Sequence, residues 1–116
     1  MTIRRMKSYT GETGFVYQYY FVGQRRALAQ AATEFVFDVT TDRKTTYSVS
    51  VFLLDRALEE WEQQHERKLV DAERYASAKM RLFRGFDEVE HMMTEGRQLL
   101  ISPTDLEELL ATLGVD

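Results

Sequence analysis

The chain has 116 residues, of which 44% are hydrophobic and 29% charged, with no Cys and one Pro. This length and composition are typical of a globular protein, and residues 1–116 are expected to form a single domain. The absence of cysteine excludes disulfides, zinc–thiolate sites, iron–sulfur clusters and thiol nucleophiles. The longest apolar run, Val51–Leu54, is far shorter than the roughly 20 residues that span a bilayer. The sequence therefore predicts a soluble, cytoplasmic protein with no membrane partner.

The formal net charge of −4 is unevenly distributed along the chain. Residues 1–54 carry seven basic and four acidic residues, a net +3, whereas residues 55–116 carry eight basic and fifteen acidic ones, a net −7. Such a split can mark a basic binding face or complementary halves that associate between subunits, and it also occurs without any functional role. We therefore expect a homo-oligomer or a protein partner.

Three β-strands are predicted in the first half of the chain. The segments 15–22, 34–41 and 45–54 are rich in aromatic and β-branched residues. Both faces of the first strand are largely apolar, which predicts a central strand or one that is buried at an interface. The polar residues 42–44 fit a hairpin loop. The Ala-rich link 23–33 is interpreted as a helical turn or a mobile loop.

The spacing of apolar residues then changes to the period of a helix. It predicts two helices, over about 55–68 and 71–93, that form a hairpin. Asp55 is the expected N-cap of the first helix. Gly96 is expected to end the second one in a left-handed conformation.

A short fourth strand at 99–101 and a C-terminal helix complete the predicted elements. Ser102 is the expected N-cap of this helix, with Pro103 at its first position and Asp105 three residues after the cap. The order βββααβα predicts an α+β fold. We expect a three- to four-stranded, mostly antiparallel sheet with a helical hairpin and a short C-terminal helix.

Two Glu-x-x-His units contain both histidines of the chain, Glu62 with His65 and Glu88 with His91. A carboxylate and an imidazole three residues apart on a helix share one face and can hold a metal ion, as in di-iron carboxylate bundles. In a helical hairpin that turns near residue 70, however, the second unit would lie roughly 15 Å beyond the first. We therefore expect no metal or other cofactor, and these four residues are only weak metal candidates.

Basic residues near an aromatic strand suggest an alternative function, the binding of nucleic acid or another anion. The candidate binding residues are Tyr20, Arg25, Arg26, Arg43 and Lys44. Aromatic rings can stack on bases, and cations can contact phosphates. The acidic total, with a sequence pI near 5.2, disfavours nucleic acid as the partner.

A third hypothesis places a small ligand between the sheet and the two helices. The candidate lining residues are Tyr17, Tyr19, Trp61 and His65. The sequence contains no Gly-x-Ser-x-Gly motif and no other catalytic signature, so no catalytic residue is predicted. The function that the sequence favours is a small, non-catalytic interaction or accessory domain that self-associates.

Overall fold

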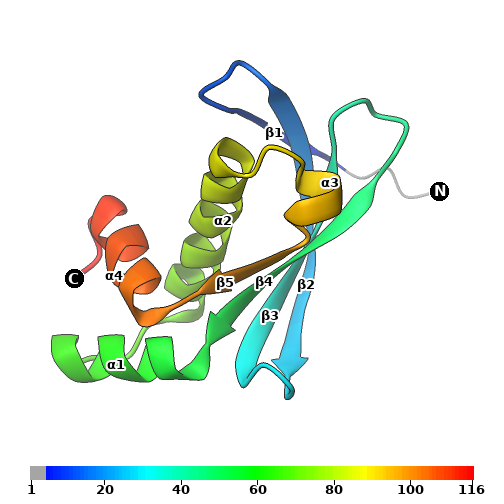
Figure 1. Cartoon of the computed structure of the whole chain (residues 1–116). Coiled ribbons are helices and arrows are strands. Elements are labelled where there is room, and N and C mark those ends of the chain that lie inside the picture. Colours follow the sequence, from blue (N-terminus) through cyan, green and yellow to red (C-terminus); the bar gives the residue numbers. More distant parts are fainter. Residues whose placement is uncertain (1–4) are drawn as a thin grey trace.

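The computed structural model describes residues 5–116, which confirm the predicted α+β class. The strands are β1 (Lys7–Thr10), β2 (Val16–Ala27), β3 (Ala32–Thr40), β4 (Tyr47–Leu54) and β5 (Gln98–Ile101). The helices are α1 (Asp55–His65), α2 (Asp71–Glu88), α3 (Met92–Glu95) and α4 (Pro103–Thr112) (Figure 1). Residues 1–4, with Arg4 of the basic half, lie outside the described residues.

The five strands form one sheet in the order β1-β2-β3-β4-β5. Strands β1 to β4 pair antiparallel, whereas β5 pairs parallel to β4, with Leu99 opposite Val51. The sequence predicted three or four mostly antiparallel strands, and the sheet is instead five-stranded and mixed. Parallel neighbours need a crossover connection, which the segment from α1 to α3 supplies.

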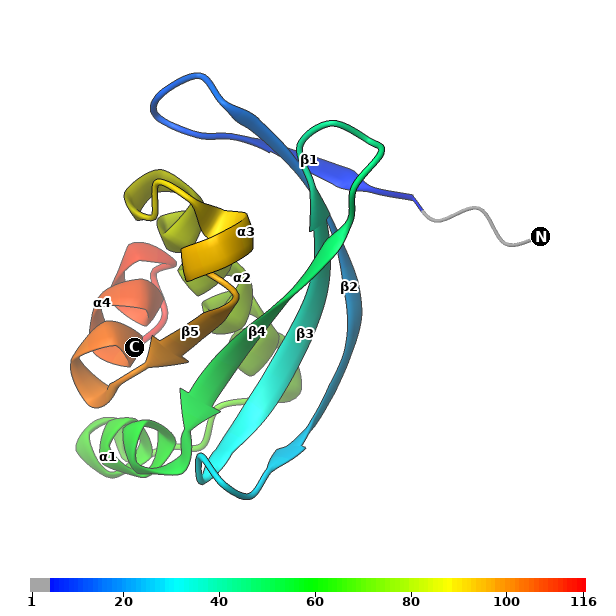
Figure 2. The ribbon, with the colours of Figure 1, turned by 45° about the vertical axis from the view of Figure 1, so that its right-hand side comes forward.

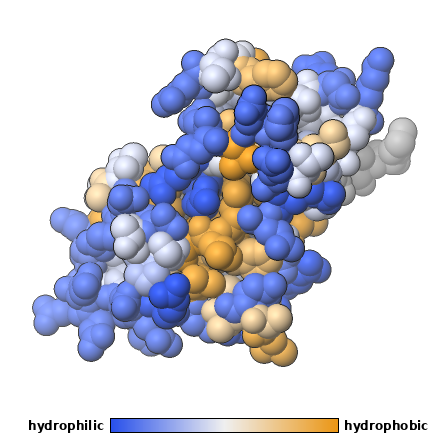
Figure 3. Space-filling view, in the orientation of Figure 1, coloured by the Kyte–Doolittle hydropathy of each residue, from blue (hydrophilic) through white to orange (hydrophobic). Residues whose placement is uncertain are grey.

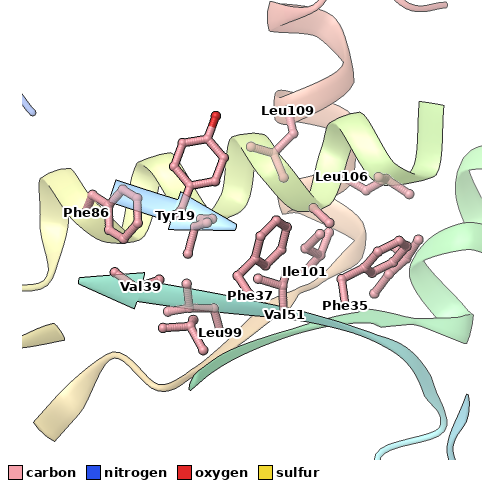
Figure 4. Packing of buried hydrophobic residues seen from close by; sticks show 14 of the residues in the cluster. Tyr19, Phe35, Phe37, Val39, Val51, Phe86, Leu99, Ile101, Leu106 and Leu109 are labelled. Atoms are coloured by element: carbon pink, nitrogen blue, oxygen red, sulfur yellow. The ribbon is translucent and has the colours of Figure 1, made fainter. Parts of the chain in front are cut away.

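The long helices cover only one face of the sheet. The sheet curves around α2, and its convex side carries no helix (Figure 2). Figure 4 shows side chains such as Phe37, Val51 and Ile101 packed between the strands and α2, and all three are fully buried. We call the convex side the open face. By strand alternation it carries Val16, Gln18, Tyr20, Arg25, Glu34, Val36, Asp38, Ser48, Ser50, Phe52 and Leu100.

Helices α1 and α2 do not form the predicted hairpin. α1 lies near the N-terminal end of α2, crosses its direction and packs against α4 (Figure 1). The chain turns between them because Glu66 adopts a left-handed backbone, with φ 54°. The turn is held by Glu62, whose carboxylate accepts a hydrogen bond from the Leu69 N–H at 2.8 Å. Leu69 is buried, so the link itself contributes to the core.

One of the three predicted helix-terminal residues acts as expected. The Ser102 hydroxyl accepts from the Asp105 N–H at 3.2 Å, and the Asp105 carboxylate accepts from the Ser102 N–H at 3.0 Å. Asp55 is the first residue of α1 and not its N-cap. Gly96 has φ −111°, which is not left-handed, and a Cβ there would clash with the Met92 sulfur. Close packing is therefore what requires this glycine.

Strand β2 continues through Gly23 into the segment that was predicted to be a helical turn or a mobile loop. It runs to Ala27, and a tight turn leads into β3 at Ala32. A β-bulge at Val22 shifts the register of β2 against β3. The inside–outside alternation reverses at this bulge, so Arg25 lies on the open face.

The outer edge of β5 contacts α2 through one side chain. The Arg81 Nε–H donates to the Leu100 carbonyl at 2.8 Å. In the part of the chain that the structure describes, no helix has the length and apolar character needed to cross a membrane.

Candidate functional site

A largely apolar cleft opens between the β1–β2 loop and α3. Its volume is about 350 Å³, at the small end of the range for ligand sites. Its lining, which we call the aromatic cleft, consists of Thr13, Phe15, Tyr17, Thr41, Tyr47, Phe86, Asp87, Val89, Glu90 and Met93. These residues come from three loops, two strands, the end of α2 and α3, several of which are far apart in the sequence.

Two tyrosines line this cleft with their rings buried. Tyr17 and Tyr47 are 7% and 8% exposed. The Tyr17 ring stacks on Phe86, with centroids 4.1 Å apart and planes 3° from parallel. Neither phenol hydroxyl makes a hydrogen bond to another described residue. Both hydroxyls are therefore available to a ligand in the cleft.

Asp87 fixes the wall of the cleft that the β1–β2 loop forms. Its carboxylate accepts from the Tyr9 hydroxyl at 2.5 Å and from the Glu12 N–H at 3.0 Å. The Tyr9 ring also stacks on Phe83, with centroids 4.3 Å apart. Gly14, with φ 84°, supplies the left-handed turn that leads into β2. The end of β1 is thus attached to α2 by the Tyr9 hydrogen bond and aromatic stack, and the loop that follows is attached by the hydrogen bond of the Glu12 N–H.

The rim of the cleft is apolar and exposed. Phe15 and Met93 are 55% and 49% exposed, and the Phe15 ring lies 5.5 Å from that of Tyr17. The sequence predicted one helix to about Met93, but α2 ends at Glu88 and Val89 is extended. This break in the helix lets Val89 and Met93 form the second wall. The spacing of apolar residues stays helical up to about Met93, so the sequence did not indicate that α2 ends at Glu88.

The environment of the cleft keeps both phenols neutral. Burial raises the pKa of Tyr47 to about 12, the nearby Tyr17 phenol adds to this effect, and Arg97 opposes it. Burial, followed by the charge of Asp87, also raises the pKa of Tyr17. At physiological pH each phenol can therefore donate a hydrogen bond to a ligand.

The pocket residues predicted from the sequence do not line one cavity. Tyr17 lines the aromatic cleft, whereas Tyr19 is buried in the core. Trp61 lines a separate groove of about 330 Å³ between α1 and α4. The His65 ring stacks on Trp61 at 4.1 Å, and its Nε2 lies 2.8 Å from a Glu107 carboxylate oxygen.

The structure does not bring the two Glu-x-x-His units together. Glu62 accepts from the backbone of the α1–α2 link, and His65 contacts a carboxylate of α4. Glu88 and His91 are exposed at the end of α2 and beyond it. In the described part of the chain, no three His, Cys, Asp or Glu side chains form a group that could hold a metal ion.

The predicted basic residues are divided between the two ends of β2. Arg25 and Arg26 lie near the β2–β3 turn, and both are paired with carboxylates. Arg25 Nε donates to Glu34 at 2.9 Å, and Arg26 forms a two-point ion pair with Asp55.

The other three predicted binding residues lie elsewhere. Arg43 and Lys44 are exposed in the β3–β4 loop, and Arg43 Nε donates to Gln18 at 3.1 Å. Gln18 is roughly 25 Å from Arg26 at 3.3 Å per strand residue. Tyr20 is half-buried on the open face, opposite Asp38. The five residues therefore do not form one surface.

Comparisons of the chain with models of protein families, with curated proteins and with solved structures found no match. The functional assignment therefore rests on the geometry of the molecule.

Proposed function

We propose that this protein is a non-catalytic binding domain whose aromatic cleft takes up a small, uncharged, apolar ligand with a hydrogen-bond acceptor. The observation that carries this proposal is the pair of buried, neutral phenols, Tyr17 and Tyr47, whose hydroxyls have no hydrogen-bond partner among the described residues. The apolar lining favours desolvation of an apolar ligand, by about 25 cal/mol per Å² buried. Asp87 and Glu90 line the cleft and disfavour an anionic ligand.

A neutral fluorescent ketone tests this proposal. Prodan, 6-propionyl-2-(dimethylamino)naphthalene, has a planar apolar body and one carbonyl acceptor, and its emission moves to shorter wavelength in an apolar site. We expect a saturable blue shift with the wild-type protein. Tyr47→Phe and Tyr17→Phe keep the rings but remove the donors. Each should weaken binding about fivefold, as expected for the loss of about 1 kcal/mol per hydrogen bond.

The matched control is Tyr20→Phe, because it makes the same chemical change on the open face. We expect this variant to bind Prodan as the wild type does. The proposal would be rejected if the wild-type protein produced no saturable shift. It would also be rejected if the variants at Tyr17, Tyr47 and Tyr20 all bound equally well.

Self-association through the open face is a second property that we propose. Val16 and Leu100 on this side of the sheet are 47% and 49% exposed. Figure 3 shows apolar residues gathered in a strip over the region of β5, with hydrophilic residues on both sides. Burying such residues against a second copy would remove apolar surface from water.

Light scattering of the purified protein measures this association. We expect a mass above the 13.6 kDa of one chain. Leu100→Lys should lower that mass, and Val70→Lys, at a 58% exposed residue before α2, should leave it unchanged. A wild-type particle of one chain at micromolar concentration would contradict the expectation.

A further inference from the structure

A second cavity lies on the other side of the β3–β4 loop from the aromatic cleft. Thr41 and Tyr47 line the cleft, whereas their neighbours Thr40 and Thr46 line this cavity. Its volume is about 440 Å³. Its lining, which we call the basic pocket, consists of Arg5, Met6, Gln18, Thr40, Arg43 and Thr46. Among the described residues, the lining thus contains two guanidinium groups and no carboxylate.

The backbone of the loop holds Arg43 in an unusual conformation. Its φ of 64° is left-handed, which costs a residue with a side chain roughly 1–2 kcal/mol. Hydrogen bonds within the loop offset this cost. The Asp42 carboxylate accepts from the N–H groups of Lys44 and Thr45, both at 2.8 Å, and the Thr40 hydroxyl accepts from the Arg43 N–H at 3.1 Å. A strained residue that its surroundings hold in place is common at binding sites.

The Arg43 side chain is oriented but not neutralised. Its Nε–H donates to the Gln18 side-chain oxygen at 3.1 Å, which leaves its terminal N–H groups free for a ligand. Within the described residues, no carboxylate lies within 4.0 Å of the Arg5 or Arg43 guanidinium. Arg25 and Arg26, at the other end of β2, each have a carboxylate partner. Among the described arginines of the strand half, residues 5–54, the two without a carboxylate partner are therefore Arg5 and Arg43.

We propose that the basic pocket binds a phosphate group. A planar guanidinium donates two parallel N–H bonds to a phosphate, and Arg5 and Arg43 both line the pocket. The Gln18 amide and the Thr46 hydroxyl add uncharged donors. Lys44 follows Arg43 directly, and its charge would add to the attraction of the loop for a dianion, against the opposing charge of Asp42. This site is separate from the cleft, which is proposed to take an uncharged ligand.

Two-dimensional ¹H–¹⁵N NMR of the full chain can detect ligand binding at individual side chains of the pocket. The Gln18 side-chain amide and the Arg43 Nε–H each give a signal of their own. We expect both signals to shift saturably on titration with inorganic phosphate, and the affinity to fall as salt is added. Arg43→Gln should lower the phosphate affinity, as measured from the Gln18 amide signal, about tenfold. The reason is that the substitution removes charge-assisted hydrogen bonds to the phosphate. Unchanged backbone signals elsewhere would show that this variant is folded.

The matched control is Arg26→Gln. It removes the same charge from an arginine that is paired with Asp55, at a distance well beyond the Debye length of about 8 Å in physiological salt. Phosphate affinity should therefore stay at the wild-type value. Equal phosphate affinity of the Arg43 and Arg26 variants would overturn the inference.

A second titration, with a mixed-sequence single-stranded oligonucleotide, distinguishes the two sources of the phosphate group. Much tighter binding of the oligonucleotide through the same signals would assign the site to a nucleic-acid backbone. Equal affinity per phosphate would assign it to small phosphorylated molecules. Both results support a phosphate site, whereas no shift of the Gln18 signal with either ligand would refute it.

Discussion

Among individual residues, Glu34 shows how a carboxylate can be buried on a sheet face that no helix covers. Arg25 donates to it from two nitrogens, at 2.9 and 3.1 Å, and the Ser50 hydroxyl donates at 2.5 Å. The hydrogen bonds from Arg25 and then Ser50 hold the pKa of Glu34 below its usual 4.5, although burial opposes this shift. The ionised carboxylate therefore stabilises the folded sheet.

Replacing this carboxylate tests its contribution. We expect Glu34→Gln to lower the free energy of unfolding by about 2 kcal/mol at pH 7, the scale of a hydrogen bond to a charged group. The folded-state pKa lies below the unfolded one, so the contribution is complete above about pH 4.5 and disappears as the pH falls through the folded-state value. Denaturant titrations at neutral and acidic pH would measure the difference.

The control is Glu59→Gln, which changes an exposed glutamate on α1. Its free energy of unfolding should match that of the wild type at both pH values. A loss from Glu34→Gln that was equally large at neutral and acidic pH would contradict the expected role.

The same residues show what a sequence cannot reveal about a site. Arg25, Arg26 and Arg43 look equivalent in the sequence, and all three were predicted to bind an anion. Which of them keeps a free charge depends on Glu34 and Asp55, and only the folded sheet brings these carboxylates to the first two. The sequence could therefore identify the candidate arginines. It could not show which of them are neutralised by a carboxylate that is distant in the sequence.

For whole elements, local patterns predicted most of the secondary structure. The strands expected at 34–41 and 45–54 lie within two residues of β3 and β4, and the α4 cap was placed correctly. β2 is different, because its bulge at Val22 reverses the alternation for the residues that follow. A period-two pattern carries no sign of an inserted residue.

The arrangement of the helices could not be read from their spacing. A period of 3.6 indicates which side of a helix is buried but not what covers it. α1 packs on α4, which follows it by some forty residues, because the link that buries Leu69 turns the chain away from a hairpin. The aromatic cleft was missed for a related reason, since its walls depend on the end of α2 at Glu88.

Across the whole molecule, part of the charge split of the sequence becomes a separation in space, although Arg25 and Arg26 lie at the α1 end of the sheet. The longest dimension is 45 Å and the shortest 24 Å. α1 and α4, whose glutamates Glu60, Glu107 and Glu108 line the groove between them, lie at one end. The β3–β4 loop with Arg43 lies at the other end (Figure 1). An anionic ligand is therefore attracted to the basic pocket and repelled from that groove.

The contact of Arg81 with the edge of β5 also affects how the protein behaves in concentrated solution. An exposed edge strand is a template on which strands of other molecules can add, and aggregation begins in this way. At this edge the Arg81 guanidinium occupies the outward carbonyl of Leu100. An incoming strand would have to displace it before pairing with β5.

Removing this side chain should expose the edge. We expect Arg81→Ala to form fibrils sooner than the wild type, as followed by thioflavin T fluorescence, at a denaturant concentration where both are equally folded. Arg56→Ala, which removes an exposed arginine from α1, controls for the change in net charge. Equal lag times for the two variants would contradict this role. One side chain of α2 thus closes the Leu100 acceptor at the β5 edge to neighbouring molecules.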